Sequence, residues 1–183
     1  MDDGHRALRV NTVEMRRRPG VTRDIELDLS SSHLHVPDER LDAPIAIELH
    51  ATSTVDGIVV TGAVVVQWHD ECRRCLAVVA RREAMEIDEM YQEEAVDPDA
   101  FEIGPDALDL FPMVRDAVVL ALADPPPLCR PDCAGICPVC GADRNVSPCG
   151  CDTSQRDERW AALDGLVGPD VGPDTGPDVG GSR

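Results

Sequence analysis

The stretch "GIVVTGAVVVQWHDECRRCLAVVARREAMEID", residues 57–88, decides the fold. Both of its halves are rich in β-branched residues, which favour a pleated strand, and the motif Cys72-x-x-Cys75 stands between them. A Cys-x-x-Cys turn lets two thiolates face one metal ion, so it suits a tight connection. The sequence therefore predicts two antiparallel strands joined at a cysteine knuckle.

Further strand and helix signals lie on both sides of this stretch. The alternating run "VTRDIELDLS" (21–30) and the β-branched run "PIAIELHAT" (44–52) predict two more strands. Asp56-Gly57 tolerates the positive φ of a hairpin turn. "LFPMVRDAVVLALA" is apolar on more than one face and predicts a buried helix over 109–123. Together they predict an α+β fold, mainly an antiparallel β-sheet with a buried helix and a C-terminal Cys-rich segment like a zinc ribbon.

Changes in composition divide the chain into four parts. The N-terminus is rich in arginine up to Pro19-Gly20, and the C-terminus repeats Gly-Pro-Asp, a pattern that buries no side chain. We expect a flexible Arg-rich arm at 1–20, a β-rich core at 21–128, a Cys-rich zinc-binding segment with a C-terminal helix at 129–167, and a disordered tail at 168–183.

The charge of the chain is strongly acidic but uneven. A formal net charge of −18 argues against a whole surface built for nucleic acid, and residues 83–110 carry acids and no base. Arginines gather instead in the N-terminal arm and around the upstream cysteine pair. These arginines form two local basic clusters, so the polarity of the chain is local and its partners have to be argued locally. The arginines are Arg16, Arg17, Arg18, Arg73, Arg74, Arg81 and Arg82.

The eight cysteines fall into spacings typical of metal ligands. The downstream Cys-Pro-Val-Cys-Gly knuckle and the Cys-Gly-Cys pair after it can turn four thiolates onto one ion. The remaining four cysteines, two upstream and two at the start of the Cys-rich segment, are then left to share a second ion. The simplest partition therefore gives two zinc sites of four cysteines each. One would use Cys72, Cys75, Cys129 and Cys133, and the other Cys137, Cys140, Cys149 and Cys151.

Other uses of the thiols stay open. Cys133-x₃-Cys137-x₂-Cys140 also fits an iron–sulfur spacing. Cys72 and Cys75 could form a reversible pair, which would make the chain a thiol redox sensor. Some thiols could simply be buried as small apolar groups. The prolines and glycines beside the downstream cysteines favour metal-binding loops over core positions.

The sequence also bears on compartment and catalysis. The N-terminus lacks the apolar region of a secretory leader, and the apolar run at 117–123 is too short to cross a bilayer. These features predict a cytoplasmic protein with no membrane partner, where paired cysteines hold metal more often than they form disulfides. A metal ion held by four cysteines has no open coordination position, and no catalytic set of side chains is evident. We expect that the chain is not an enzyme.

The order of the motifs "CRRCL", "DLFPMVRDAVVLALADPPPLC", "CAGICPVCGADRN", "CGC" and "DERWAALDGL" resembles the YceD family. That family is linked to the accumulation of large-subunit ribosomal RNA. The resemblance covers roughly residues 20–167, and the Cys-rich segment with the helix before it is its most specific part. The chain departs from the pattern at Ala123-Asp124, where Leu-Pro is more usual, and at Glu158, where proline is common. Neither departure touches a candidate ligand.

The resemblance implies a bacterial role in making or stabilising the precursor of 23S rRNA, and hence in large ribosomal subunit biogenesis. It implies ribosomal RNA, a pre-50S particle or a basic ribosomal protein as partner. Some members lack the Cys-Pro-x-Cys-Gly knuckle, in keeping with two separate sets of four cysteines. Two mechanisms follow: an RNA-binding factor that uses the arginines, or a protein-binding adaptor or chaperone whose acidic segment 83–110 holds a basic ribosomal protein.

Overall fold

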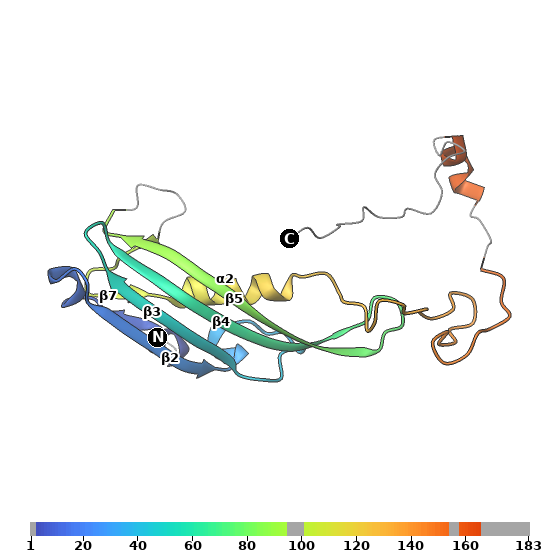
Figure 1. Cartoon of the computed structure of the whole chain (residues 1–183), viewed down its shortest axis with the longest axis horizontal. Helices are drawn as coiled ribbons and strands as arrows, with labels where there is room; N and C mark the ends of the chain where they lie inside the picture. The colour runs from blue at the N-terminus through green and yellow to red at the C-terminus, as the bar shows by residue number, and fades with distance from the viewer. Residues whose placement is uncertain (1–2, 95–100, 154–157, 166–183) are drawn as a thin grey trace, which may run out of the picture. The chain divides into compact units, whose positions relative to one another are not determined.

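The computed structural model describes residues 3–94, 101–153 and 158–165 (Figure 1). The chain divides into two compact units, Met1–Ala134 and Gly135–Arg183, and each is described by itself. The division falls between Cys133 and Cys137, inside the Cys-rich part that the sequence placed at 129–167. The first cysteines of that part therefore belong to the unit that holds the sheet.

A five-stranded sheet forms the frame of the first unit, in the order β2-β3-β4-β5-β6 (Figure 1). Neighbouring strands are antiparallel, except that β6 pairs in parallel with the end of β5. The strands predicted from the sequence are confirmed, and the Cys-x-x-Cys motif joins two of them. The bounds are β2 (Thr22–Leu29), β3 (Ile45–Ser53), β4 (Ile58–Glu71), β5 (Val78–Gln92) and β6 (Phe101–Glu102).

The hairpin between β3 and β4 is closed at the predicted turn. The Thr54 N–H donates a hydrogen bond of 2.8 Å to the carbonyl of Gly57, whose φ of 151° lies in the region that favours glycine. A Cβ on Gly57 would fall 2.2 Å from the Tyr91 carbonyl oxygen. Both the backbone angle and the close approach of β5 therefore require glycine at this turn.

One face of the sheet carries the core, because alternate residues of each strand point to it. Helix α2 (Phe111–Leu122) packs against β4 and β5. Its start is marked by Asp109, whose Oδ1 accepts a hydrogen bond of 3.1 Å from the Phe111 N–H. The predicted helix is present, but only one of its faces is buried, because Val119 and Leu120 on the other side are 42% and 62% exposed. The buried residues of β4 and α2 include Val60, Val64, Val66, Trp68, Met113, Val114, Val118 and Ala121.

The N-terminal residues differ from the flexible arm that the sequence predicted. Leu8 and Met15 are fully buried, and the imidazole Nε2 of His5 lies 2.8 Å from Asp109 Oδ2. These two apolar anchors hold residues 3–20 on the core despite their many arginines, because each removes a large side chain from water. The elements here are α1 (Asp3–Ala7), β1 (Arg9–Asn11) and η1 (Met15–Arg17), and β1 pairs antiparallel with β7 (Ala107–Asp109).

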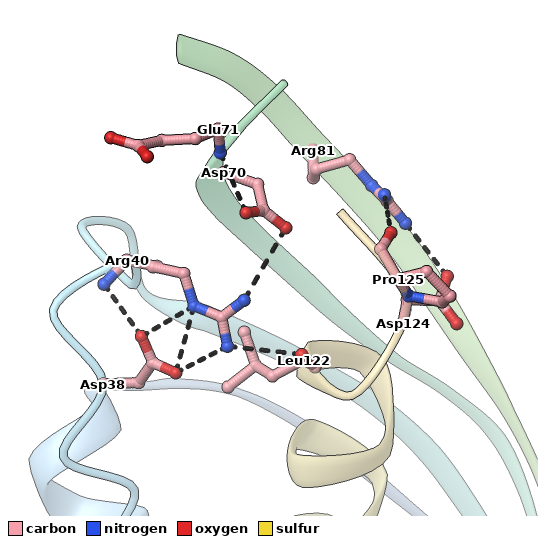
Figure 2. A network of polar contacts seen from close by, with 8 residues as sticks. All are labelled: Asp38, Arg40, Asp70, Glu71, Arg81, Leu122, Asp124 and Pro125. Carbon is pink, nitrogen blue, oxygen red and sulfur yellow. Dashed lines mark hydrogen bonds and ion pairs between the residues drawn. The ribbon is translucent and has the colours of Figure 1, made fainter. Parts of the chain in front are cut away.

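Arg40 joins three parts of the first unit, as Figure 2 shows. It follows η2 (Ser31–Leu34), and its Nη2 donates to Asp38 Oδ2 at 2.8 Å and to the Leu122 carbonyl at 3.2 Å. Its Nη1 lies 3.6 Å from Oδ2 of Asp70, a carboxylate that is 9% exposed. The guanidinium therefore ties the loop before β3 to β4 and to the end of α2.

Replacing Arg40 by alanine should lower the free energy of unfolding by about 1–3 kcal/mol, because buried Asp70 then keeps its charge without a cation. Arg40→Lys should be intermediate, since it keeps the charge but not the planar fork.

The Arg40 hydrogen bond also lowers the pKa of Asp38 below its ordinary 3.8, so this stabilisation exists above that pH and is lost as pH falls through the lower folded pKa. Urea unfolding at neutral pH and near the Asp38 pKa measures both effects. The difference in free energy of unfolding between wild type and Arg40→Ala should become smaller in acid. An unchanged difference would contradict the ion-pair explanation.

The second unit has little regular structure in its described residues. A single β-bridge joins Ile136 to Asp143, and the 3₁₀ helix η3 (Glu158–Gly165) lies where the sequence predicts a C-terminal helix. The tail predicted at 168–183 lies outside the described residues. No helix among the described residues of either unit is long and apolar enough to cross a membrane.

Candidate metal centres

The first cluster of thiols forms where the β4–β5 connection meets the segment after α2. Cys72 Sγ lies 3.8 Å from Cys133 Sγ, and Cys75 Sγ lies 3.5 Å from Cys129 Sγ. All four sulfurs lie within 4.8 Å of one another. A disulfide needs about 2 Å between sulfurs, whereas Zn–S bonds of about 2.3 Å in a tetrahedron place sulfurs about 3.8 Å apart. The geometry therefore fits four thiolates around one ion.

Backbone and side-chain contacts hold this cluster together. The Arg73 N–H donates to the Pro127 carbonyl at 3.0 Å, and Arg74 Nη1 donates to the Cys133 carbonyl at 2.9 Å. Cys72 and Cys133 are buried, while Cys129 is exposed. The cluster thus fastens the chain that follows α2 to the far end of the β4–β5 hairpin.

The second cluster lies within the second unit and is wholly local in sequence. The sulfurs of Cys137, Cys140, Cys149 and Cys151 also lie within 4.8 Å of one another. Cys137 is buried and Cys140 is exposed. The structure thus brings the cysteines together in the two groups that their spacing predicted, and both groups could hold a metal ion.

The two knuckles have the same backbone hydrogen bonds. In each, the N–H of the first cysteine donates to the carbonyl of the residue five positions later at 2.8 Å, and its carbonyl accepts from the N–H four positions later at 2.9 Å. The residue after the second cysteine has positive φ in both: 61° at Leu76 and 72° at Gly141. A left-handed conformation costs an L-residue about 1–2 kcal/mol, and glycine avoids this cost. Leu76 is therefore the strained member of a matched pair.

Backbone N–H groups prepare one thiol of each cluster for a metal. Burial opposes ionisation of Cys72, but backbone N–H groups, led by that of Cys129, outweigh it and lower its pKa to about 6. Backbone N–H groups led by that of Cys140 lower the pKa of Cys137 to about 6. These thiols are therefore readily ionised, as metal ligation requires.

Other thiols of the same clusters shift in the opposite direction. The hydrogen bond to the Cys75 thiol raises the pKa of Cys129 to about 12. The hydrogen bond to the Cys140 thiol raises the pKa of Cys151 to about 12. Thiolates this close suppress one another's ionisation, and a cation between them would remove that penalty. The pKa shifts and the distances between the sulfurs therefore both indicate that each cluster is suited to bind a cation.

Three of the arginines predicted to contact RNA are engaged within the first unit. Arg16 donates to Glu93 and to the Pro105 carbonyl. Arg81 pairs with Asp124 at 2.9 Å and its guanidinium lies 5.1 Å from the centre of the Trp68 ring. Arg74 bonds the Cys133 carbonyl, as described above. These side chains have structural partners, and their contact with RNA stays a prediction.

The other four predicted arginines are exposed, but they do not form one patch. Arg17, Arg18, Arg73 and Arg82 make no side-chain hydrogen bond or ion pair with another described residue. The first two lie near the start of β4, since the Gly20 N–H bonds the Ser53 carbonyl there. Arg73 follows the end of β4, a strand of 14 residues and so about 45 Å long. The structure therefore separates the two arginine clusters.

Rows of acidic residues, which were not predicted from the sequence, lie on the solvent face of the sheet. The register aligns Glu26, Glu48, Ala63 and Glu86 across four strands, and the three glutamates are exposed. Glu26 and Glu48 are direct cross-strand partners, an arrangement of like charges that destabilises a sheet. The acidic face, as we name it, consists of Asp24, Glu26, Asp28, Glu48, Glu86 and Asp88. Acids at alternate positions of 24–28 and 86–88 were the signal that could have revealed it.

Comparison with known proteins identifies the relatives of this chain. Its residues 60–167 match the family described as large ribosomal RNA subunit accumulation protein YceD. Uncharacterized proteins of Mycobacterium tuberculosis and Mycobacterium bovis are each 33% identical to it, over 89% of this chain and 83% of the relative. An uncharacterized protein of Mycobacterium leprae is 32% identical over 70% of this chain and 62% of the relative. No solved structure matches. The chain belongs to the YceD family, whose description associates it with accumulation of the large ribosomal RNA subunit.

Proposed function

We propose that the chain is a non-enzymatic, cytoplasmic factor that supports 23S rRNA accumulation during biogenesis of the large ribosomal subunit. Family membership supports the process. The two four-thiol clusters support zinc as the metal, because zinc favours tetrahedral sulfur ligands. With all four positions filled by thiolates, each ion would be structural: the first would fix the end of the β4–β5 hairpin and the second would order the local Cys-rich loop.

We infer from the acidic face how the protein acts: it contacts a basic ribosomal protein. Its carboxylates occupy adjacent rows of a rigid sheet, and Asp24 is the one that pairs with a base, His50, at 2.7 Å. Such a field attracts cationic partners and repels phosphate. The acidic face therefore favours the adaptor mechanism. The binding surface that we propose for it is this face of the sheet, not the whole of segment 83–110.

RNA contact is the second candidate, supported by the exposed guanidinium groups of Arg73, which lies in the knuckle of the first metal centre, and Arg82 on β5. Each phosphate contact would make the plot of log affinity against log salt concentration steeper, by a slope of about −0.9. Replacing both arginines by alanine would then flatten that slope by about 2.

Sedimentation with ribosomal precursors tests the proposal. The metal-loaded protein should co-sediment with pre-50S particles, and a Glu26→Gln, Glu48→Gln, Glu86→Gln variant should do so more weakly. The matched control is Arg73→Ala with Arg82→Ala, which should co-sediment like wild type. Loss in the arginine variant alone, together with a flattened salt slope on a 23S rRNA fragment, would replace the adaptor mechanism by RNA binding. A wild-type protein that never enters the precursor fractions would contradict the proposed function.

A further inference from the structure

A groove of about 530 Å³ lies beside the first metal centre. Leu76, Val78 and Pro126 form its apolar surface, and Leu76 is 55% and Val78 70% exposed. Apolar side chains gathered in one concave site, with polar residues around them, mark an interaction surface. Leu76 lies in the knuckle and Val78 begins β5, while Pro126 precedes Pro127, whose carbonyl accepts the Arg73 N–H hydrogen bond, so the groove is already formed.

Leu76 is kept at this site against the preference of its backbone. Its φ of 61° matches the φ of 72° at Gly141 in the second knuckle, where glycine avoids the strain. Leu76 is 55% exposed, so packing within the fold does not account for leucine here. A strained residue whose side chain points to solvent is a marker of a functional site.

The charges around the groove select the partner. Glu39 and Glu71 are exposed at its rim, whereas Arg40 is engaged with Asp38 and Asp70. Glu71 lies an even number of residues beyond Ala63 on β4, so it shares the solvent face with the acidic rows. The groove is thus an apolar site on the same face of the sheet as the acidic rows. Arg73 is an exposed base in its lining, His69 is paired with Asp42 at 2.9 Å, and exposed Arg82 lies on that face between the groove and the rows.

We propose that this groove binds a basic segment of a partner protein, seating one apolar side chain of that segment against Leu76. The cationic side chains of the segment lie beside Glu39 and Glu71 and extend over the acidic face. This inference rests on the proposed function and adds to it the docking point and the chemistry of the bound segment. Phosphates of RNA fit less well, because the two carboxylates at the rim repel them.

Overlapping synthetic peptides that tile the proteins of the large ribosomal subunit provide the probe. The full-length, metal-loaded protein should bind peptides that combine net positive charge with a large apolar residue. Leu76→Gly should weaken that binding by roughly tenfold or more, the effect of losing one buried apolar side chain. Glycine suits the positive φ, so this variant should keep its metal content, and its thermal midpoint should not fall. Glu71→Gln should weaken binding less and reduce its salt dependence.

The matched control is Val55→Gly, which removes a side chain that is 88% exposed at the β3–β4 turn, the other end of β4. It should bind the same peptides as wild type. Three results would overturn the proposed docking site: equal peptide binding by wild type and Leu76→Gly, equal loss of binding in Leu76→Gly and Val55→Gly, or no bound peptide at all. If wild type and Leu76→Gly still co-sediment with pre-50S particles in those cases, the proposed function stands without this docking site.

Discussion

Replacing Cys133 by serine should reduce bound zinc from about two ions per chain to about one, because four thiolates close each tetrahedral site. Cys133 is buried and belongs to the first cluster with Cys72, so Cys72→Ser should have the same effect. Both variants should also lower the thermal midpoint by roughly 10 °C or more, since structural zinc binding contributes directly to folding. Metal analysis by mass spectrometry and thermal unfolding measure the two effects.

Cys149→Ser is the matched variant for the second cluster. It should also remove one ion, but it should leave unfolding of the sheet-bearing unit near wild type, because Cys149 belongs to the other unit. An iron–sulfur cluster on Cys133, Cys137 and Cys140 predicts a different pattern: visible absorbance, and no loss of metal in Cys72→Ser. Retention of both ions by Cys133→Ser and Cys72→Ser would contradict the two-site assignment.

The grouping of the cysteines could be predicted from the sequence because ligand spacing limits which thiols can share an ion. Cys137 and Cys140 form one short turn, and arithmetic leaves Cys72 and Cys75 to a distant pair. The strands were equally accessible, since alternation in 21–30 and β-branched runs are local signals. A few neighbouring residues determine the strands and the local knuckle, and the distant pairing then follows by elimination.

The N-terminal segment shows why other features could not be predicted. Five of residues 1–20 are arginine, so composition indicates an exposed arm. The two residues that hold it, Leu8 and Met15, are buried by elements far away in sequence: Arg9 of β1 pairs with Asp109 of β7. A pairing across so many residues leaves no periodic signal in either segment.

The docking groove was hidden for a related reason. A positive φ is normally predicted from glycine or asparagine, and Leu76 is neither. The signal was comparative: Gly141 stands at the same place in the second knuckle, so counting from each first cysteine would have indicated the conformation of Leu76. The acidic face likewise needed the strand register, because only pairing shows that Glu26 and Glu48 are neighbours.

Gly62→Ala should destabilise the first unit by at least about 3 kcal/mol, because backbone atoms occupy the space that a Cβ needs. That Cβ would fall 2.1 Å from the Glu48 carbonyl oxygen and 2.9 Å from Leu49 Cα, both on the neighbouring strand β3. Gly62 also has a φ of 138°. The clash can be relieved only by moving β4 away from β3, which breaks the pairing of Glu48 with Ala63 and so the rows of the acidic face. Urea unfolding of the metal-loaded proteins measures the loss.

Gly20→Ala separates strain from clash in this test. Gly20 has a φ of 89°, yet its Cβ would meet no heavy atom within 4 Å, so the same substitution there adds backbone strain alone. It should cost about 1–2 kcal/mol. If the two variants lose equal stability, the close approach of β3 and β4 at Gly62 is not what requires glycine. If Gly62→Ala folds but binds the basic peptides weakly while Gly20→Ala binds them normally, spacing between these strands sets the acidic face as well as the fold. Normal peptide binding by a folded Gly62→Ala protein would instead place the recognition surface away from the β3–β4 rows.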